Sequence, residues 1–396
     1  MREMKDSGVE WLGEVPAEWN FDRFGSFFAL RNERVSDEEY IPLSVTMGGV
    51  VPQLSHVAKS DDHANRKLVC KGDFVINSRS DRRNSCGFAS QDGSVSLINT
   101  ICVPRGEIES RYFGYLFDSS QWSDEFYSWG HGIVADLWTT GWNDMKKILL
   151  PVPPLDEQRR IADYLDEKCA EVDRAVSAAE QSIEEYKLLL SAVIDERFSR
   201  YGRRVKLSRI SSLITDGDHQ APPRSDEGIP FLVISNISKG KIDFSNTDYV
   251  SEKYYDSLPI SRRAQKGDVL VSVTGSYGIP VVVDVERPFC FQRHIALVRP
   301  SVDPDYIRFA MKTSEFSHYC DGVVTGAAQK TLTLGSLRSA PIIDVPSAEV
   351  DVLVRNLLAK EAEIDAAIAA KRAIIADLKA YKQSLIYETV TGKREV

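Results

Sequence analysis

The sequence predicts an α+β protein in which two pseudo-repeated, mixed α/β blocks are separated by two long antiparallel coiled-coil helices. Three observations indicate this fold class. The phrase AEVDRAV at 170–176 returns as AEIDAAI at 362–368, an offset of 192 residues. Each copy lies in a stretch of about forty residues without Gly or Pro, which is typical of a long helix. A turn-rich segment with short β-like runs precedes each stretch.

The helical repeat is ungapped from Pro154 and Pro346 to Glu196 and Glu388. Proline ends the segment before each helix, and about forty residues at ~1.5 Å each would give a rod of roughly 60 Å. Apolar residues then recur at alternating steps of four and three, the a/d pattern of a coiled coil. The predicted seam consists of Val172, Val176, Ala179, Ile183, Tyr186, Leu190 and Val193 in the first helix and Ile364, Ile368, Ile375, Leu378 and Leu385 in the second. Lys371 and Lys382 interrupt the second stripe.

Four segments follow from this repeat. Residues 1–150 form block one, 151–200 the first helix, 201–340 block two and 341–396 the second helix. The blocks share landmarks: KGDFVINS at 71–78 corresponds to KGDVLVSV at 266–273, and RYFGYLF at 111–117 to DYIRFAM at 305–311. Because the first helix leads from one block to the other and the second returns, we expect the blocks at opposite ends of the rod.

Composition is that of a globular protein, with 43% hydrophobic and 27% charged residues. No apolar run approaches the ~20 residues of a transmembrane helix, and the N-terminus lacks the apolar region of a secretory signal. The six cysteines are scattered without a C-x-x-C pair, which argues against a zinc site or a disulfide framework. We therefore expect a cytoplasmic protein with reduced thiols, no membrane contact and no bound metal.

The net charge of −9 is unevenly distributed along the chain. Block one has 16 basic and 22 acidic residues, whereas block two has 18 basic and 15 acidic residues. Basic clusters occur at 79–84, 203–209, 261–263 and 292–294. A protein that binds DNA alone is usually more basic, because neutralising phosphates supplies most of the non-specific affinity. If this chain reads DNA, a partner must supply much of the phosphate contact.

Catalytic motifs are absent from the sequence. It contains no G-x-x-x-x-G-K-[ST] loop for a nucleoside triphosphate and no glycine-rich dinucleotide fingerprint. An Asn-Pro-Pro-aromatic motif, the usual sign of an amino-methyltransferase, is also missing. We therefore expect a chain that is not an enzyme and binds no cofactor of its own.

One loop in block one and two loops in block two could contact nucleic acid or be ordinary surface loops. RSDRRNS at 79–85 combines Arg, which reads guanine in the major groove, with Asn, which reads adenine, but a solvated charged loop explains it equally well. In block two, TGSYG at 274–278 could approach a phosphate or form a hairpin turn, and QRH at 292–294 offers donors like those of block one. The candidate DNA-binding residues are Ser78, Arg79, Arg82, Arg83, Asn84, Thr274, Ser276, Tyr277, Gln292, Arg293 and His294.

Other polar and aromatic clusters have simpler interpretations. TDGDH at 215–219 is more typical of a turn-forming loop than of a metal site, because the other ligands of a calcium loop are missing. Asp73 and Asp268 in the two KGD sequences are expected to be turn residues at a strand entrance. The tryptophans between 122 and 142 favour core packing over base stacking.

Several motifs together resemble one known family. They are DSGVEWLGEVPAEW at 6–19, PVPPLDEQRRIADYLDEKCAEVD at 151–173, TDGDHQAPP at 215–223, KGDVLVSVTGSYG at 266–278 and LIYETVTGK at 385–393. On these motifs the whole chain resembles a specificity subunit of a type I restriction-modification system. The second helix departs from the family pattern at its start, where VPSAEVD replaces the usual Pro-Pro-x-x-Glu-Gln opening, although Glu349 occupies the position of Glu157.

The resemblance implies a function for each segment. The two blocks would be target-recognition domains, each reading one half of a split double-stranded DNA sequence, and the helices would set the spacing between the halves. Two methyltransferase subunits would dock on the helices, and restriction subunits would join the full complex. S-adenosylmethionine and ATP are then expected on those partner subunits only. Dissimilar blocks imply an asymmetric target.

One alternative from another functional class stays open at the level of sequence. The chain could be a coiled-coil scaffold that holds two protein-interaction modules and never touches DNA. The acidic net charge favours this alternative mildly, and the paired basic loops speak against it.

Overall fold

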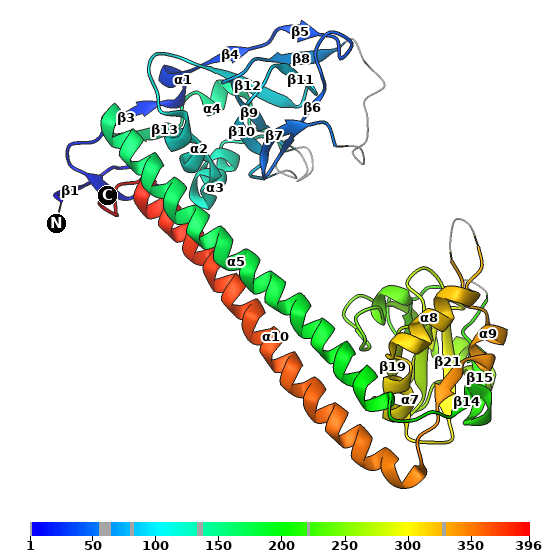
Figure 1. The fold of residues 1–396 in the computed structure, drawn as a ribbon. Helices are drawn as coiled ribbons and strands as arrows, with labels where there is room; N and C mark the ends of the chain where they lie inside the picture. Colours follow the sequence, from blue (N-terminus) through cyan, green and yellow to red (C-terminus); the bar gives the residue numbers. More distant parts are fainter. Residues whose placement is uncertain (1, 55–64, 80–82, 133–137, 220–221, 327–329) are drawn as a thin grey trace. The chain divides into compact units, whose positions relative to one another are not determined.

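The structure is a computed structural model that describes residues 2–54, 65–79, 83–132, 138–219, 222–326 and 330–396 (Figure 1). The chain forms two compact units, the first made of Met1–Ala179 with Ala373–Val396 and the second of Glu180–Arg372. Both long helices, α5 (Leu155–Phe198) and α10 (Ser347–Val390), are shared between the units. The division into four segments at 150, 200 and 340 stays a prediction.

The first unit is built around a four-stranded antiparallel sheet of order β10-β9-β12-β4. These strands are β10 (Cys86–Phe88), β9 (Phe74–Asn77), β12 (Asn99–Pro104) and β4 (Phe28–Arg31). A second sheet has the order β11-β8-β5, with β11 (Gly93–Val95), β8 (Arg66–Val69) and β5 (Arg34–Val35). The remaining elements are β1 (Met4–Asp6), β2 (Glu14–Pro16), β3 (Asn20–Arg23), α1 (Phe24–Phe27), the hairpin β6 (Leu43–Thr46) and β7 (Gly49–Pro52), α2 (Ser110–Asp118), α3 (Ser120–Ser128), α4 (Trp142–Met145) and β13 (Leu149–Val152).

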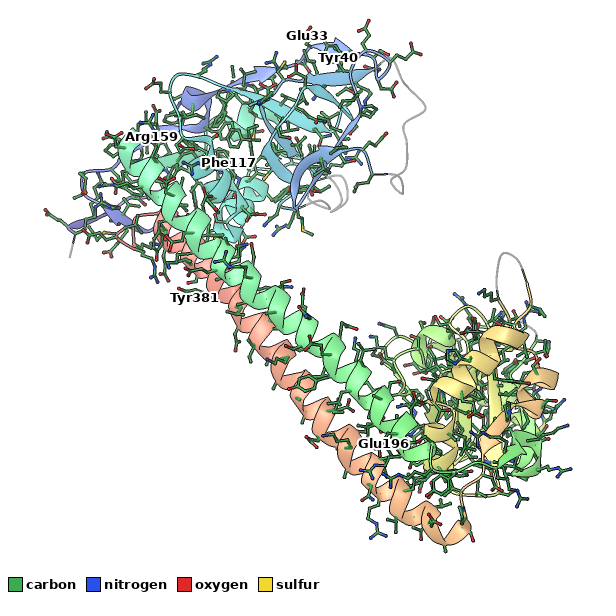
Figure 2. All side chains as sticks on the ribbon, in the orientation of Figure 1. Glu33, Tyr40, Phe117, Arg159, Glu196 and Tyr381 are labelled. Atoms are coloured by element: carbon green, nitrogen blue, oxygen red, sulfur yellow. The ribbon has the colours of Figure 1, made fainter. Side chains whose placement is uncertain are left out.

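Aromatic side chains form the core between this sheet and helices α2 and α3. Trp122, only 1% exposed, stacks near Phe24 and Phe117, with ring centroids 6.0 and 4.7 Å away. Phe117 of α2 is labelled in Figure 2. Trp129 and Trp142 pack against the edge of the same cluster. The expectation of core packing is therefore confirmed for these three tryptophans, whose indoles bury apolar surface. Trp138 is half-buried outside this cluster, and its indole N–H donates to the carbonyl of Tyr127 at 2.8 Å.

The second unit repeats the strand order of the main sheet with different side chains. Its main sheet has the order β15-β21-β18-β19, with β15 (Ser211–Asp216), β21 (Ile295–Pro300), β18 (Val269–Ser272) and β19 (Pro280–Val282). A smaller sheet has the order β17-β16-β20, with β17 (Asp248–Val250), β16 (Ile229–Leu232) and β20 (Cys290–Phe291). The other elements are β14 (Arg204–Lys206), α6 (Glu252–Ser257), α7 (Pro304–Ala310), α8 (Ser314–Val323), α9 (Leu334–Ser339) and β22 (Pro341–Ile343), with one-turn 3₁₀ helices at 207–209, 234–236 and 260–262.

The two KGD turns enter equivalent central strands, β9 and β18, and each turn is fixed by its aspartate. Asp73 accepts from the backbone N–H of Cys70, and Asp268 accepts from that of Gln265, both at 2.8 Å. An arginine neutralises each buried carboxylate, but from different strands of the sheet. Arg31 on β4 donates to Asp73 at 2.7 Å, whereas Arg299 on β21 donates to Asp268 at 2.8 Å. The pairs compensate charges that would otherwise be costly to bury.

Within each unit the start of one long helix packs against the end of the other, so the two helices are antiparallel. In the first unit, Ile161 and Leu165 of α5 share a core with Leu385 and Ile386 of α10. In the second, Ile194 and Phe198 of α5 share a core with Leu353, Val354 and Leu357 of α10. The strand before each helix also pairs with a strand at the start of the same block, β13 with β3 and β22 with β14. The predicted fold class is confirmed in this arrangement.

Candidate nucleic-acid interface

The block-one candidate residues lie in the loop after β9 and differ in burial. Ser78 is buried, and its hydroxyl lies 2.7 Å from that of Thr100. Arg79 is exposed and forms an isolated β-bridge with Thr139. Arg82 lies outside the described residues. Ser78 is therefore an interior hydrogen-bonding residue in this structure, and Arg79 lies at the surface.

Helix α3 holds the side chain of Arg83 in place. The Arg83 guanidinium donates to Asp124 at 2.7 Å and lies 5.2 Å from the ring centroid of Tyr127. Asn84, beside it, has a φ of 58°, a left-handed conformation that asparagine tolerates better than most residues. Because the side chain of Arg83 is 55% exposed, it can reach a ligand while α3 restricts its motion.

The equivalent loop after β18 is tied to α8 through a different group. Tyr277 donates a hydrogen bond from its hydroxyl to Asp321 of α8 at 2.8 Å, and this bond raises the pKa of Tyr277. Ser276 is exposed, whereas Thr274 is only 4% exposed. In both blocks, a carboxylate on the second helix therefore fixes one side chain of the candidate loop.

The turn at 292–294 lies against the loop at 274–278. The Thr274 hydroxyl is 3.0 Å from Nδ1 of His294. Burial and the neighbouring charge of Arg293 lower the pKa of His294, which favours a neutral ring. Arg293 is exposed, and Gln292 and His294 are half-buried. The structure thus brings the two block-two candidate loops, which lie some twenty residues apart in sequence, into one cluster.

The same cluster includes residues that the sequence did not single out as a site. Asp218 and Gln292 form a parallel β-bridge, and the N–H of Arg293 donates to the carbonyl of Asp218 at 3.0 Å. Arg262, in the 3₁₀ turn at 260–262, places its guanidinium 3.5 Å from Asp216 and 3.9 Å from Asp218. Neither sequence spacing nor a motif joins Arg262 to the loop at 215–219. The basic cluster at 261–263 was its only signal.

The two aspartates of this cluster form hydrogen bonds with neighbouring side chains. Asp216 lies 2.8 Å from Nε2 of His219, and Asp218 accepts from the hydroxyl of Tyr254. Burial, and then the bond to Asp218, raise the pKa of Tyr254. Among the residues that the structure describes, no group of three or more His, Cys, Asp or Glu side chains is arranged to hold a metal ion.

The predicted seam residues are all buried or half-buried. Buried members are Val172, Ala179, Ile183, Ile364, Ile368 and Leu385, and half-buried members are Val176, Tyr186, Leu190, Val193, Ile375 and Leu378. Lys382, which interrupts the stripe in sequence, donates to Asp173 on α5 at 2.7 Å. Tyr381 next to it projects outward and is 49% exposed (Figure 2). The interruption is therefore an interhelical ion pair.

No described helix is both long enough and apolar enough to span a membrane. No protein-family model matches the chain. Two curated relatives match the chain in sequence. The type I restriction enzyme EcoBI specificity subunit of Escherichia coli is 25% identical over 236 residues, which cover 52% of this chain and 49% of that protein. A putative type I restriction enzyme MjaX specificity subunit of Methanocaldococcus jannaschii is 24% identical over all of this chain and 93% of the relative. The chain thus spans about half the length of the first relative and nearly all of the second.

Two solved structures are also similar to this chain. A chain from a study of complex assembly and conformational transition of the type I restriction-modification system superposes with a TM-score of 0.70 at 18% identity, covering 96% of this chain and 99% of that one. The HsdS subunit from Thermoanaerobacter tengcongensis has a TM-score of 0.48 at 20% identity, covering 96% and 98%. In sequence, this chain is therefore a homologue of two curated type I restriction enzyme specificity subunits, and it shares its fold with a chain of a type I restriction-modification system.

Proposed function

We propose that this chain is the DNA-reading subunit of a type I restriction-modification complex and recognises a bipartite, asymmetric target. The observation that carries the proposal is the relationship to a specificity subunit across the full length of the chain, joined to the matching fold. Block one would bind one half of the target and block two the other half. The cytoplasm, where DNA and the partner subunits are found, would be its site of action.

Different side chains at equivalent loops support an asymmetric target. In block one the loop after β9 presents Arg83, an arginine fork that suits guanine. In block two the loop after β18 presents Ser276 and Tyr277, with Gln292 and Arg293 beside it. Because the donors differ in number and geometry, the two blocks should select different bases.

Partner subunits account for the activities that this sequence does not explain. The acidic balance of the chain favours a complex in which other subunits supply part of the phosphate contact. Two methyltransferase subunits would dock on α5 and α10 and bring S-adenosylmethionine, and restriction subunits would bring ATP-driven cleavage. The helices would set the distance between the half-sites. A scaffold that never touches DNA is not favoured, since both curated relatives are specificity subunits.

The experiment compares two arginines with equal exposure. Arg83, whose side chain is 55% exposed, belongs to the candidate loop, and Arg159, 54% exposed, lies on α5. We expect Arg83→Ala to weaken binding of the assembled methyltransferase complex to its target by about tenfold, the loss of roughly one base contact. Arg159→Ala, on the helix proposed to dock the methyltransferase subunits, should leave the target affinity of the assembled complex unchanged, and co-purification shows separately whether it changes assembly.

Binding is measured by gel shift with target duplex and with random-sequence duplex, and co-purification with the methyltransferase subunits reports assembly. Equal target affinity for the wild-type complex and the Arg83→Ala complex would remove this loop from the interface. Failure of the wild-type complex to prefer any duplex sequence would contradict the proposed function itself.

A further inference from the structure

We propose that Arg262 reads the guanine of a G·C base pair in the half-site bound by block two, and that Asp216 and Asp218 position it. This inference rests on the proposed function and names a specificity-determining residue for it. Arg262 ends the 3₁₀ turn at 260–262, and its side chain is 28% exposed. It is thus neither buried nor fully solvated.

Two carboxylates restrain the guanidinium without saturating it. Nη2 of Arg262 lies 3.5 Å from Oδ1 of Asp216, and Nη1 lies 3.9 Å from Oδ1 of Asp218. Hydrogen bonds to oxygen are usually about 2.7–3.2 Å long, so these are ion pairs held by charge rather than short hydrogen bonds. The donors of the fork therefore remain available to a ligand, while the paired charges fix its position.

Both carboxylates belong to a backbone segment that packs tightly against the turn at 292–294. Gly217, between them, has no room for a side chain, because a Cβ would collide with the carbonyl oxygens of Phe291 and Gln292. The N–H of Asp218 donates to the carbonyl of Phe291 at 3.1 Å. Tyr254 holds Asp218 from α6, and His219 holds Asp216. Arg262 is thereby placed in the same cluster as Gln292 and Arg293.

Local charge decides which part of DNA this arginine suits. Two carboxylates face one guanidinium, so a phosphate approaching the pair meets excess negative charge. The N7 and O6 atoms of guanine are neutral acceptors that match a guanidinium fork bidentately in the major groove. A restrained arginine fork beside two acids therefore fits a base edge better than the DNA backbone.

Arg263 is a matched control beside it. Its side chain is 27% exposed, close to the 28% of Arg262. Its guanidinium, however, donates to the carbonyls of Leu258 and Asp256 at 3.2 and 2.6 Å and lies 5.1 Å from the ring centroid of Tyr255. Arg263 thus stabilises its own turn, and we expect Arg263→Ala to lower stability without changing base preference.

The test uses the chain assembled with its methyltransferase subunits and a duplex library randomised at every position of both half-sites. Sequencing of the methylated products gives the base preference at each position. Wild type should require a G·C pair at one or more positions of the block-two half-site. Arg262→Ala should lower discrimination at one such position by about 5- to 150-fold, the range of a bidentate base contact. Preferences in the block-one half-site and at the other positions of the block-two half-site should stay unchanged, and the latter report that block two is folded.

Two further variants separate base reading from charge and from structure. Arg262→Lys keeps the charge but loses the fork, so it should lose discrimination at the same position. Asp216→Asn should lose part of that discrimination, as expected of a positioning residue. The inference is overturned if Arg262→Ala lowers methylation uniformly or leaves every preference intact, if Arg262→Lys behaves as wild type, or if the block-two half-site contains no G·C pair. A wild-type complex without any sequence preference would instead contradict the proposed function.

Discussion

Helices α2 and α7 occupy equivalent places in the two units and pack on the start of α5 and of α10 by different chemistry. Some contacts are shared: Tyr112 of α2 donates to the carbonyl of Pro151, and Tyr306 of α7 donates to that of Ile343. These carbonyls belong to β13 and β22, the strands that lead into the long helices. The framework of the repeat is therefore kept by hydrogen bonds to the backbone, which tolerate change in the surrounding side chains.

A second shared contact joins each block to the first turns of its long helix. Trp19 donates from its indole N–H to Glu157 of α5 at 3.1 Å, and Tyr201 donates from its hydroxyl to Glu349 of α10 at 2.9 Å. The donor differs, but the acceptor carboxylates are 192 residues apart, the offset of the repeat. The departure of the second helix from the family pattern at its start does not remove this contact.

The ionic contacts differ in burial. In the second unit, Arg308 and Lys312 of the α7 region both reach Glu361 of α10, and the three side chains are 9%, 26% and 16% exposed. In the first unit, Arg111 of α2 pairs with Asp163 and Asp166 of α5, all at least 43% exposed. The two helices are therefore placed alike, but their ion pairs differ in strength. An ion pair shielded from water interacts more strongly and costs more to break than an exposed one.

Glu361→Ala should give the largest effect, because Lys312 loses its buried partner and Arg308 is left with the more exposed Asp305. We expect a loss of about 3–5 kcal/mol in the free energy of unfolding of the second unit. Urea denaturation, monitored by hydrogen exchange of the amides of α7, measures this loss. Glu363→Ala is the control, since Glu363 is 69% exposed and pairs with Lys360 on its own helix. Equal destabilisation by the two variants would contradict the distinction between buried and exposed pairs.

Asp118→Asn should have the opposite effect in the first unit and raise its free energy of unfolding. Burial raises the pKa of Asp118 to about 6, whereas Lys382 only partly offsets the shift. A carboxyl whose pKa is higher in the folded state than in the unfolded state stabilises the fold when protonated, and this stability is lost as pH rises through about 6. The variant should therefore be about 1–3 kcal/mol more stable than wild type at pH 7.5.

The pH dependence checks this assignment. Between pH 7 and pH 4 the wild-type first unit should gain stability from Asp118, and Asp118→Asn should lack that gain. In the second unit, burial raises the pKa of Glu361, but Lys312 and Arg308 outweigh burial and lower it. Its stabilisation is present above the unfolded pKa and is lost as pH falls below about 4.5. Melting curves that show no opposite trends would refute the comparison.

Arg111→Ala should have the smallest effect. Its ion pairs with Asp163 and Asp166 are exposed, and such pairs contribute about 0–1 kcal/mol. We expect a change of less than about 1 kcal/mol in the free energy of unfolding, which falls further in high salt. A loss comparable to that of Glu361→Ala would show that burial does not decide the strength of these contacts.

The repeated framework could be predicted from the sequence because it depends on local patterns of residues. Periodicity identified the two long helices, and the KGD turns marked the central strands. The candidate site was less accessible, because strand register places Ser78 and Thr274 in the interior although both follow a strand end. The link of Arg262 to Asp216 and Asp218 depends on tertiary packing of 3₁₀ turn and loop, which no spacing encodes. Which cations share Glu361 could likewise be found only in the folded chain.

The central claim is that one chain carries two dissimilar readers for the two halves of one DNA target. Methylome sequencing of a host with and without this chain, its methyltransferase subunits being present in both, tests it most directly. The account predicts methylation at a split, asymmetric sequence that disappears when the chain is removed. Methylation that persists without the chain, or that occurs at a continuous or symmetric sequence, would contradict it.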